Sequence, residues 1–263
     1  MKVKRIVSGI ILIIIVALLL IAGNTTAVNI AISTVAIMAV NEYFNCFKEK
    51  KNLERIIGII FCIPIAFLNI VSTNFLIIML PALFVSLFLV IIATNMRHDY
   101  SDIAMSGFGI IYIISFIMFI PLLYKTENGK FLIWYMAIAA WGTDTFAYFI
   151  GVRLGKHKLT KISPKKSIEG CVAGIIGATL MSLLYTYLLN KTGVMEISYL
   201  AIIGISIMLS ILGEIGDLAA SSIKRYAGIK DFSNLIPGHG GILDRIDSIL
   251  FIAPFAYFLL LLI

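Results

Sequence analysis

FLIIMLPALFVSLFLVIIATN, residues 75–95, is a stretch of uncharged and mostly apolar side chains. As an α-helix it would be about 32 Å long, enough to cross the roughly 30 Å hydrocarbon core of a bilayer. Eight more mostly apolar stretches, separated by short polar loops, lie at about 6–23, 26–45, 56–72, 103–124, 131–152, 168–190, 197–223 and 243–263. We therefore predict an all-α, polytopic integral membrane protein with about nine transmembrane helices.

The composition of the chain agrees with this fold class. Apolar residues make up 60% of the 263 positions and charged residues 13%, against about 45–50% and about 25% in soluble domains. No polar linker interrupts the sequence, so residues 1–263 are interpreted as one membrane domain. The first span has the alternative of a cleaved signal peptide, but its long apolar run and the span directly after it favour a retained helix. The three cysteines lack metal-binding spacing and are interpreted as free structural thiols.

The basic residues indicate the orientation of the chain. If nine spans alternate strictly, 18 of the 21 Lys and Arg fall on the side of the N-terminus. Because cytoplasmic loops retain Lys and Arg, this distribution predicts an N-in, C-out topology. The net charge of +7 is therefore attributed to orientation and to anionic lipid headgroups, and no nucleic acid partner is expected.

Several polar residues occur where lipid would exclude them. In the eighth span, Ser210, Glu214, Asp217, Ser221 and Lys224 recur at intervals of three or four residues. On a helix this spacing forms one polar stripe. The stripe lies at the cytoplasmic end of the span, beside the basic loops.

The last span adds two carboxylates, Asp244 and Asp247. Only sixteen uncharged residues follow Asp247, which is about 24 Å of helix, so the helix is predicted to begin near Asp244. The two carboxylates would share one face at the cytoplasmic boundary. Asp144, nine residues before Arg153, is a further intramembrane carboxylate on the same side.

Buried carboxylates that converge are costly unless they pair with bases or hold a cation. Ion pairing stays open, because Arg225, Lys230 and Arg245 are near in the sequence. A cation site is the favoured interpretation, and oxygen ligands without His or Cys indicate Mg²⁺ rather than Zn²⁺.

Two basic segments adjoin the carboxylates. Residues 224–241 run from a Lys-Arg pair into the glycine-rich turn Pro-Gly-His-Gly-Gly, whose backbone N–H groups suit phosphate. Residues 153–167 carry Lys165 and Lys166 at a predicted helix start, where they either orient the loop or contact an anionic substrate. Together these features predict phosphoryl or nucleotidyl transfer at the membrane surface.

These segments resemble the phosphatidate cytidylyltransferase (CDP-diacylglycerol synthase) family. The similarity is carried by SIKR at 222–225, KD at 230–231 and HGGILDRID at 239–247, with support from GEIGD at 213–217 and ISPKKSIEG at 162–170. It covers roughly residues 140–250. The resemblance implies that CTP and phosphatidic acid react to give CDP-diacylglycerol and pyrophosphate by in-line attack of the lipid phosphate on the α-phosphorus.

The resemblance also implies roles for single residues. Mg²⁺, with a second cation as an option, would be bound by Asp217, Asp244 and Asp247, and these carboxylates would act in catalysis with Lys224 and His239. Residues implied in substrate binding are Arg225, Lys230, Asp231, Gly240, Gly241 and Arg245, with Asp144, Lys165 and Lys166 as weaker candidates.

On this interpretation, residues 1–130 are scaffold helices and residues 131–263 form the catalytic part. The active site would face the cytoplasm from the cell inner membrane, and a homodimer is considered. A CDP-archaeol synthase, which acts on an ether-linked lipid phosphate, is an alternative that the motifs do not separate. An ion-coupled transporter is the alternative from another class, but the chain shows no internal repeat of the kind that transporters have.

Overall fold

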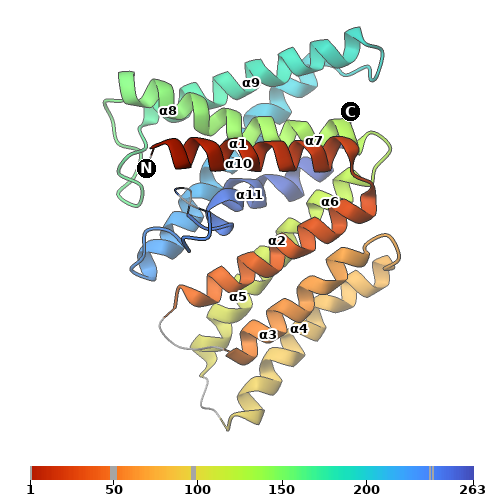
Figure 1. Ribbon diagram of the computed structural model, residues 1–263, viewed down its shortest axis with the longest axis vertical. Coiled ribbons are helices and arrows are strands. Elements are labelled where there is room, and N and C mark those ends of the chain that lie inside the picture. Colours follow the sequence, from red (N-terminus) through yellow and green to blue (C-terminus); the bar gives the residue numbers. More distant parts are fainter. Residues whose placement is uncertain (1, 48–51, 96–98, 237, 239) are drawn as a thin grey trace. The chain divides into compact units, whose positions relative to one another are not determined.

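The computed structural model describes residues 2–47, 52–95, 99–236, 238 and 240–263, and Figure 1 shows this part of the chain as helices joined by loops. Within these described ranges, the helices form nine runs that overlap the nine predicted spans. These runs are α1 (Lys2–Ala22), α2 (Thr25–Asn45), α3 (Asn52–Cys62) with η1 (Ile63–Phe67), α4 (Thr73–Ala93), α5 (Tyr100–Ile117) with α6 (Phe119–Tyr124), α7 (Gly129–Ala137) with η2 (Ile138–Gly142) and α8 (Thr143–Leu154), α9 (Ile168–Lys191), α10 (Tyr199–Tyr226) and α11 (Leu243–Leu260). The all-α prediction is confirmed for the described residues.

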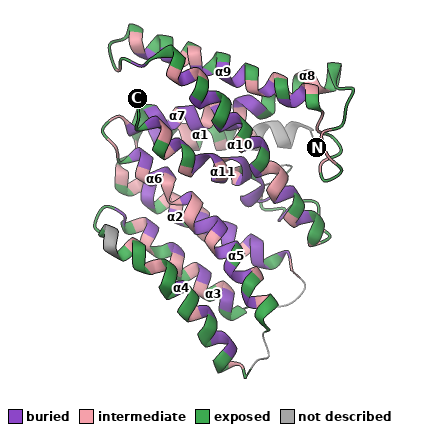
Figure 2. Cartoon of the chain, turned by 180° about the vertical axis from the view of Figure 1, so that it is seen from behind, coloured by how far each residue is buried: buried purple, intermediate pink, exposed green. Residues whose placement is uncertain are grey.

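Five helical segments in the described ranges are long and apolar enough to cross a bilayer. They are Thr25–Asn45, Phe75–Ala93, Tyr100–Tyr124, Ile168–Lys191 and Tyr199–Tyr226. Figure 2 shows many exposed positions along α4 and α9, and these include large apolar side chains such as Ile77 and Leu184. Such surfaces suit lipid better than water. The full set of nine spans and the N-in, C-out orientation stay predictions.

Polar side chains define where several helices begin. Asn24, Ser72, Asp99, Ser167 and Ser198 each accept a hydrogen bond from the backbone N–H three residues further on, at the starts of α2, α4, α5, α9 and α10. Such N-caps satisfy one of the free N–H groups of the first helical turn. The cap at Ser167 places Lys166 directly before the start of α9.

The chain divides into two compact units. Unit 1 consists of Met1–Lys125 and Asp231–Arg245, and unit 2 of Thr126–Lys230 and Ile246–Ile263. In unit 1, the hydroxyl group of Tyr124 donates to the carbonyl oxygens of Leu20 (3.1 Å) and Gly23 (2.8 Å). This side chain therefore joins α6 to the turn between α1 and α2.

In unit 2, α8 and α9 approach each other closely along a row of glycines. A Cβ atom at Gly174 would lie 2.7 Å from the carbonyl oxygen of Thr143, and one at Gly177 would overlap the ring of Phe146. Small residues at these positions allow two helices to pack backbone against backbone. Just before α8, η2 forms a π-helical turn, a rare distortion that often marks functional positions.

Candidate functional site

The polar stripe of α10 forms a buried face, as predicted. Ser210, Glu214, Ser221 and Lys224 are buried, and Asp217 is partly buried. The helix is therefore oriented so that its charged side chains lie within the protein rather than against lipid, which is where a functional cluster in a membrane protein is expected.

Lys166 pairs with two carboxylates of this stripe. Its Nζ atom lies 2.5 Å from Glu214 Oε2 and 2.6 Å from Asp217 Oδ2, and its side chain is only 17% exposed. Burial by itself would lower the pKa of Lys166, but the negative charges of Asp217 and Glu214 outweigh it and raise the pKa above its ordinary value. Arg225, Lys230 and Arg245 were the bases named for the open alternative of ion pairing. These three are exposed, and the pairing base comes instead from a loop about fifty residues upstream.

Three further charged side chains of unit 2, those of Asp144, Lys224 and Asp247, interact electrostatically with this stripe or with one another. Asp247 is buried, and the charges of Asp217, Lys224 and Asp144 act on it. Its Oδ1 accepts a hydrogen bond from the backbone N–H of Ser248 at 2.8 Å. The backbones of α10 and α11 lie close together at Gly216, because a Cβ atom there would be only 2.7 Å from the carbonyl oxygen of Asp247. Asp217 and Asp247, thirty residues apart in the sequence, are thus brought into one charged cluster.

Asp144 does not occupy the buried position expected for an intramembrane carboxylate. It is exposed, whereas its neighbour Thr143 is 2% exposed. The reason lies in the packing described above: Thr143 and Phe146 take the side of α8 that faces the glycines of α9. The charge of the Asp144 carboxylate nevertheless acts on Asp247.

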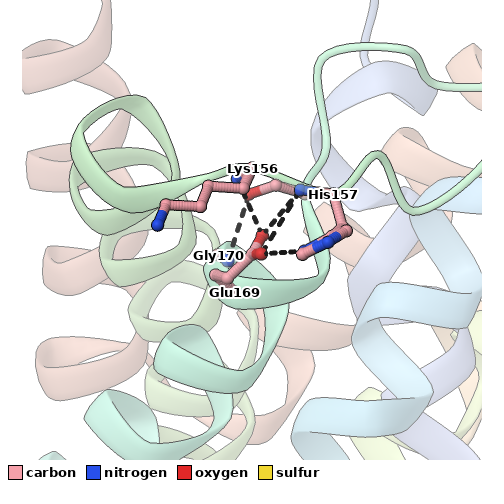
Figure 3. A network of polar contacts seen from close by, with 5 residues as sticks. Lys156, His157, Glu169 and Gly170 are labelled. Atoms are coloured by element: carbon pink, nitrogen blue, oxygen red, sulfur yellow. Dashed lines mark hydrogen bonds and ion pairs between the residues drawn. The ribbon is translucent and has the colours of Figure 1, made fainter.

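The loop between α8 and α9, which carries Lys166, is held closed by the carboxylate of Glu169. Figure 3 shows the Glu169 carboxylate facing the backbone N–H groups of Lys156 and His157 and the His157 ring. The distance from His157 Nδ1 to Glu169 Oε1 is 2.6 Å. Backbone bonds from Leu159 N to Lys166 O and from Ile168 N to His157 O, at 3.0 and 2.9 Å, complete the closed loop. Lys166 therefore stands on a structured segment.

In unit 1, the segment 231–245 is folded around the carboxylate of Asp244. This side chain is buried, and its Oδ2 accepts hydrogen bonds from the backbone N–H groups of Phe232 and Gly241, both at 2.9 Å. Gly240 has a φ of +82°, a left-handed conformation that favours glycine. The predicted start of the last helix is confirmed, since α11 begins at Leu243. The Asp244 carboxylate thus holds the loop before α11 closed.

Glu42, near the end of α2, was not predicted as a site residue. It is 6% exposed, and its carboxylate accepts hydrogen bonds from Ser233 Oγ (2.7 Å), Ile242 N (2.9 Å) and Leu243 N (2.8 Å). A lone Glu at the end of an apolar stretch looks like an interfacial residue. The only signal in the sequence was that a glycine-rich turn and a helix start needed an acceptor for their N–H groups.

The remaining predicted residues lie at the surface of their units or outside the described part of the chain. Exposed side chains are Lys165, Arg225, Lys230, Asp231 and Arg245. They are accessible to a ligand in this conformation. His239 lies outside the described residues.

The carboxylates fit a Mg²⁺ ion only in part. Over the described ranges, no group of three or more His, Cys, Asp or Glu side chains is close enough to hold a metal ion. Asp217 and Asp247 are nevertheless two hard oxygen ligands in one cluster. Mg²⁺ is commonly bound by one or two carboxylates and completed by water and substrate phosphates. Two carboxylates therefore suit a Mg²⁺ ion only if water or phosphate oxygens supply its other ligands.

Comparison with known proteins gives a consistent set of relatives. A family model described as the cytidylyltransferase family matches residues 3–263. The phosphatidate cytidylyltransferase of Bacillus subtilis (strain 168) is 38% identical over 183 residues, which are 68% of this chain and 66% of that protein. A protein of the same name from Staphylococcus aureus (strain COL) is 37% identical, and the chain spans 62% of its length. The relative from Staphylococcus haemolyticus (strain JCSC1435) is 32% identical over 99% of both chains.

Proposed function

Since this chain belongs to the cytidylyltransferase family, we propose that it transfers a cytidylyl group from CTP to phosphatidic acid, with CDP-diacylglycerol and pyrophosphate as products. The observation that carries the proposal is the cluster in unit 2. The buried Glu214, Lys224 and Asp247 are gathered there with the partly buried Lys166 and Asp217, in a chain rich in apolar helices. Such a cluster is suited to binding a charged lipid headgroup and a nucleoside triphosphate.

The reaction needs charge neutralisation more than proton transfer. An oxygen of the lipid phosphate attacks the α-phosphorus of CTP, a new P–O bond forms, and the bond from the α-phosphorus to the bridging oxygen of pyrophosphate breaks. Because the nucleophile is already an anion, no strong general base is required. Negative charge accumulates on the phosphates in the transition state, and positively charged groups stabilise it.

The residues of the cluster are suited to these tasks. Lys224 is buried on the same face of α10 as Asp217, and we assign it to the phosphates. The exposed Arg225, Lys230 and Arg245, the glycines at 240 and 241 and His239 are assigned to the triphosphate and the headgroup, following the family motif. Asp144, Lys165 and Asp231 are assigned to outer substrate contacts.

Mg²⁺ is proposed at Asp217 and Asp247, with Asp244 as the third ligand that the motif predicts and a second cation as an option. Bound there, the metal would withdraw negative charge from the phosphates. Lys166 pairs with both Asp217 and Glu214. A Mg²⁺ ion held by Asp217 would compete for that carboxylate, and the Lys166 ammonium would then be available to a phosphate oxygen. We therefore assign Lys166 a role in binding the substrate.

The finer features of topology also belong to this proposal. Nine spans, an N-in and C-out orientation and an active site that faces the cytoplasm follow from the distribution of basic residues. The bacterial relatives support a location in the cell inner membrane. A homodimer is the proposed oligomeric state.

A direct assay tests the activity. Purified protein in detergent, supplied with Mg²⁺, CTP labelled at the α-phosphorus and phosphatidic acid, is expected to form lipid-extractable label and an equal amount of pyrophosphate. An ether-linked lipid phosphate, offered in parallel, distinguishes the CDP-archaeol synthase alternative. If folded protein forms neither product with either lipid, the proposal is wrong.

Substitution of the carboxylates tests the metal assignment. Asp217→Asn and Asp244→Asn should each lower kcat by at least about 100-fold, because a metal ligand and its charge are lost. Glu196→Gln, which changes an exposed carboxylate between α9 and α10, is the matched control and should keep the wild-type rate. A near-normal rate in either Asn variant contradicts the assignment of that residue.

A further inference from the structure

Glu42 links α2 to a segment about two hundred residues later in the chain. Its Oε1 accepts bonds from Ser233 Oγ and Ile242 N, and its Oε2 accepts one from Leu243 N. All four residues belong to unit 1. The side chain is almost fully buried, so these donors replace the water that a carboxylate would otherwise bind.

The donors occupy a defined place in the fold. Ile242 and Leu243 stand at the start of α11, where the first N–H groups of a helix have no partner within the helix itself. A carboxylate at this position satisfies two of these groups and interacts favourably with the positive end of the helix dipole. Glu42 therefore caps the start of α11 from another helix, α2, whereas an N-cap residue usually lies directly before the helix that it caps.

The turn before α11 is built around the same carboxylate. A Cβ atom at Gly241 would overlap the carboxylate of Glu42, so the backbone approaches this side chain as closely as glycine allows. The N–H group of Gly241 itself points to Asp244 Oδ2. Two buried carboxylates thus accept three consecutive backbone N–H groups: Asp244 accepts that of Gly241, and Glu42 accepts those of Ile242 and Leu243.

We infer that Glu42 is a positioning residue for the transfer reaction. It fixes where α11 begins, and with that the direction in which the first turn of the helix presents Asp244 and Asp247. The inference rests on the proposed function, because those two carboxylates matter only if they act on the substrate or its metal. Glu42 itself touches backbone and a serine, and no reacting atom is assigned to it.

The chemistry of the donors specifies a carboxylate. Three donors face the side chain, and a carboxylate has two acceptor oxygens and no hydrogen to repel them. Glutamine has nearly the same shape, but its NH₂ group would oppose the backbone N–H of Ile242 or of Leu243, whichever way the amide is turned. Aspartate keeps both acceptors and is shorter by one methylene group. Glu42→Gln and Glu42→Asp therefore separate the effect of acceptor chemistry from that of side-chain volume.

The test compares these variants in the phosphatidic acid assay. Glu42→Gln should lower kcat by about 10- to 100-fold, as expected when a buried donor loses its acceptor, and should raise the Mg²⁺ concentration needed for half-maximal rate. The KM for phosphatidic acid should stay within about twofold of wild type. Glu42→Asp should recover part of the lost rate. Glu127→Gln, at an exposed carboxylate of unit 2, is the control and should behave as wild type.

A second measurement is independent of turnover. Hydrogen exchange at residues 240–247 should become faster in Glu42→Gln, whereas exchange in α9 should be unchanged. Should Glu42→Gln fail to fold, Ser233→Ala removes one donor and should still give a lower kcat, by about threefold, and faster exchange in the same segment.

The outcomes separate the two proposals. If the wild-type protein has no activity, the proposed function fails and the exchange result alone decides whether Glu42 holds the segment. If the wild-type protein is active and Glu42→Gln has the same kcat, the same Mg²⁺ dependence and the same exchange, the inference is wrong. It is equally wrong if the rate falls but Glu42→Gln and Glu42→Asp are impaired to the same extent without faster exchange.

Discussion

Lys166 is held between two carboxylates, and its charge depends on them. Because Asp217 and Glu214 stabilise the ammonium form, the pKa of Lys166 lies above its ordinary value of 10.5. A raised pKa in the folded state means that the stabilising contribution is complete below the ordinary value and is lost only as the pH rises through the raised one. Across the neutral range, the ammonium group of Lys166 therefore stays charged.

Replacing this lysine should affect stability and turnover together. Lys166→Met leaves two buried carboxylates without their cation, and we expect the free energy of unfolding to fall by about 3–5 kcal/mol. The loss should be the same at every pH between about 6 and 9, and kcat should fall as well. Thermal unfolding in detergent at a series of pH values measures this. Lys161→Met, at an exposed lysine of the same loop, is the control. A destabilisation that disappears toward pH 9 would contradict the raised pKa.

Substitution of Glu169 should also disturb the position of Lys166, because Glu169 holds closed the loop on which Lys166 lies. Its carboxylate accepts bonds from two backbone N–H groups and lies against the ring of His157. In Glu169→Gln one acceptor oxygen is lost, so the loop should open more often. We expect a three- to tenfold loss of kcat/KM and faster hydrogen exchange at residues 156–166. Glu196→Gln serves as the control, and unchanged exchange in this loop would exclude a positioning role for Glu169.

At the scale of helices, the close contact of α8 with α9 depends on the absence of side chains. Gly174→Ala would place a Cβ 2.7 Å from the carbonyl oxygen of Thr143, a backbone atom that cannot rotate away. We expect a loss of about 1–3 kcal/mol in the free energy of unfolding. Gly204→Ala in α10 is a matched control, because nothing lies within 4 Å of its Cβ position. That variant should be neutral or slightly more stable, since alanine favours a helix. Equal stability of the two variants would contradict the contact.

Helix faces could be predicted from the sequence, but contacts between distant segments could not. The stripe on α10 and the start of α11 near Asp244 follow from spacing and from the length of an apolar run, both of which are local properties. The bond from Glu42 to Leu243 joins residues 201 positions apart, and no local pattern reports such a pair. The π-helical turn before Asp144 could not be predicted either, because residues 138–142 contain neither a proline nor a glycine pair that would mark it.

At the scale of the whole molecule, the proposed topology predicts which loops face the cytoplasm. In Lys161→Cys the new thiol should react with a membrane-impermeant maleimide only in inside-out vesicles, whereas in Glu196→Cys it should react in intact cells. The native cysteines should give little background, because all three are buried and burial raises the pKa of Cys46 to about 12. Labelling of both new cysteines from one side would contradict the alternation of nine spans.

Unit 1 is discontinuous in the chain, and this has a consequence for its synthesis. Residues 231–245 complete a unit that otherwise ends at Lys125. Glu42 is synthesised first, and the N–H group of Ile242 that donates to it is synthesised 200 residues later. At about 5–20 residues per second this takes roughly 10–40 s. During that time the nascent chain holds an acidic side chain whose donors do not yet exist. Throughout this interval an unfinished chain differs from a complete one by a carboxylate without its donors, which is a difference that membrane quality control can recognise.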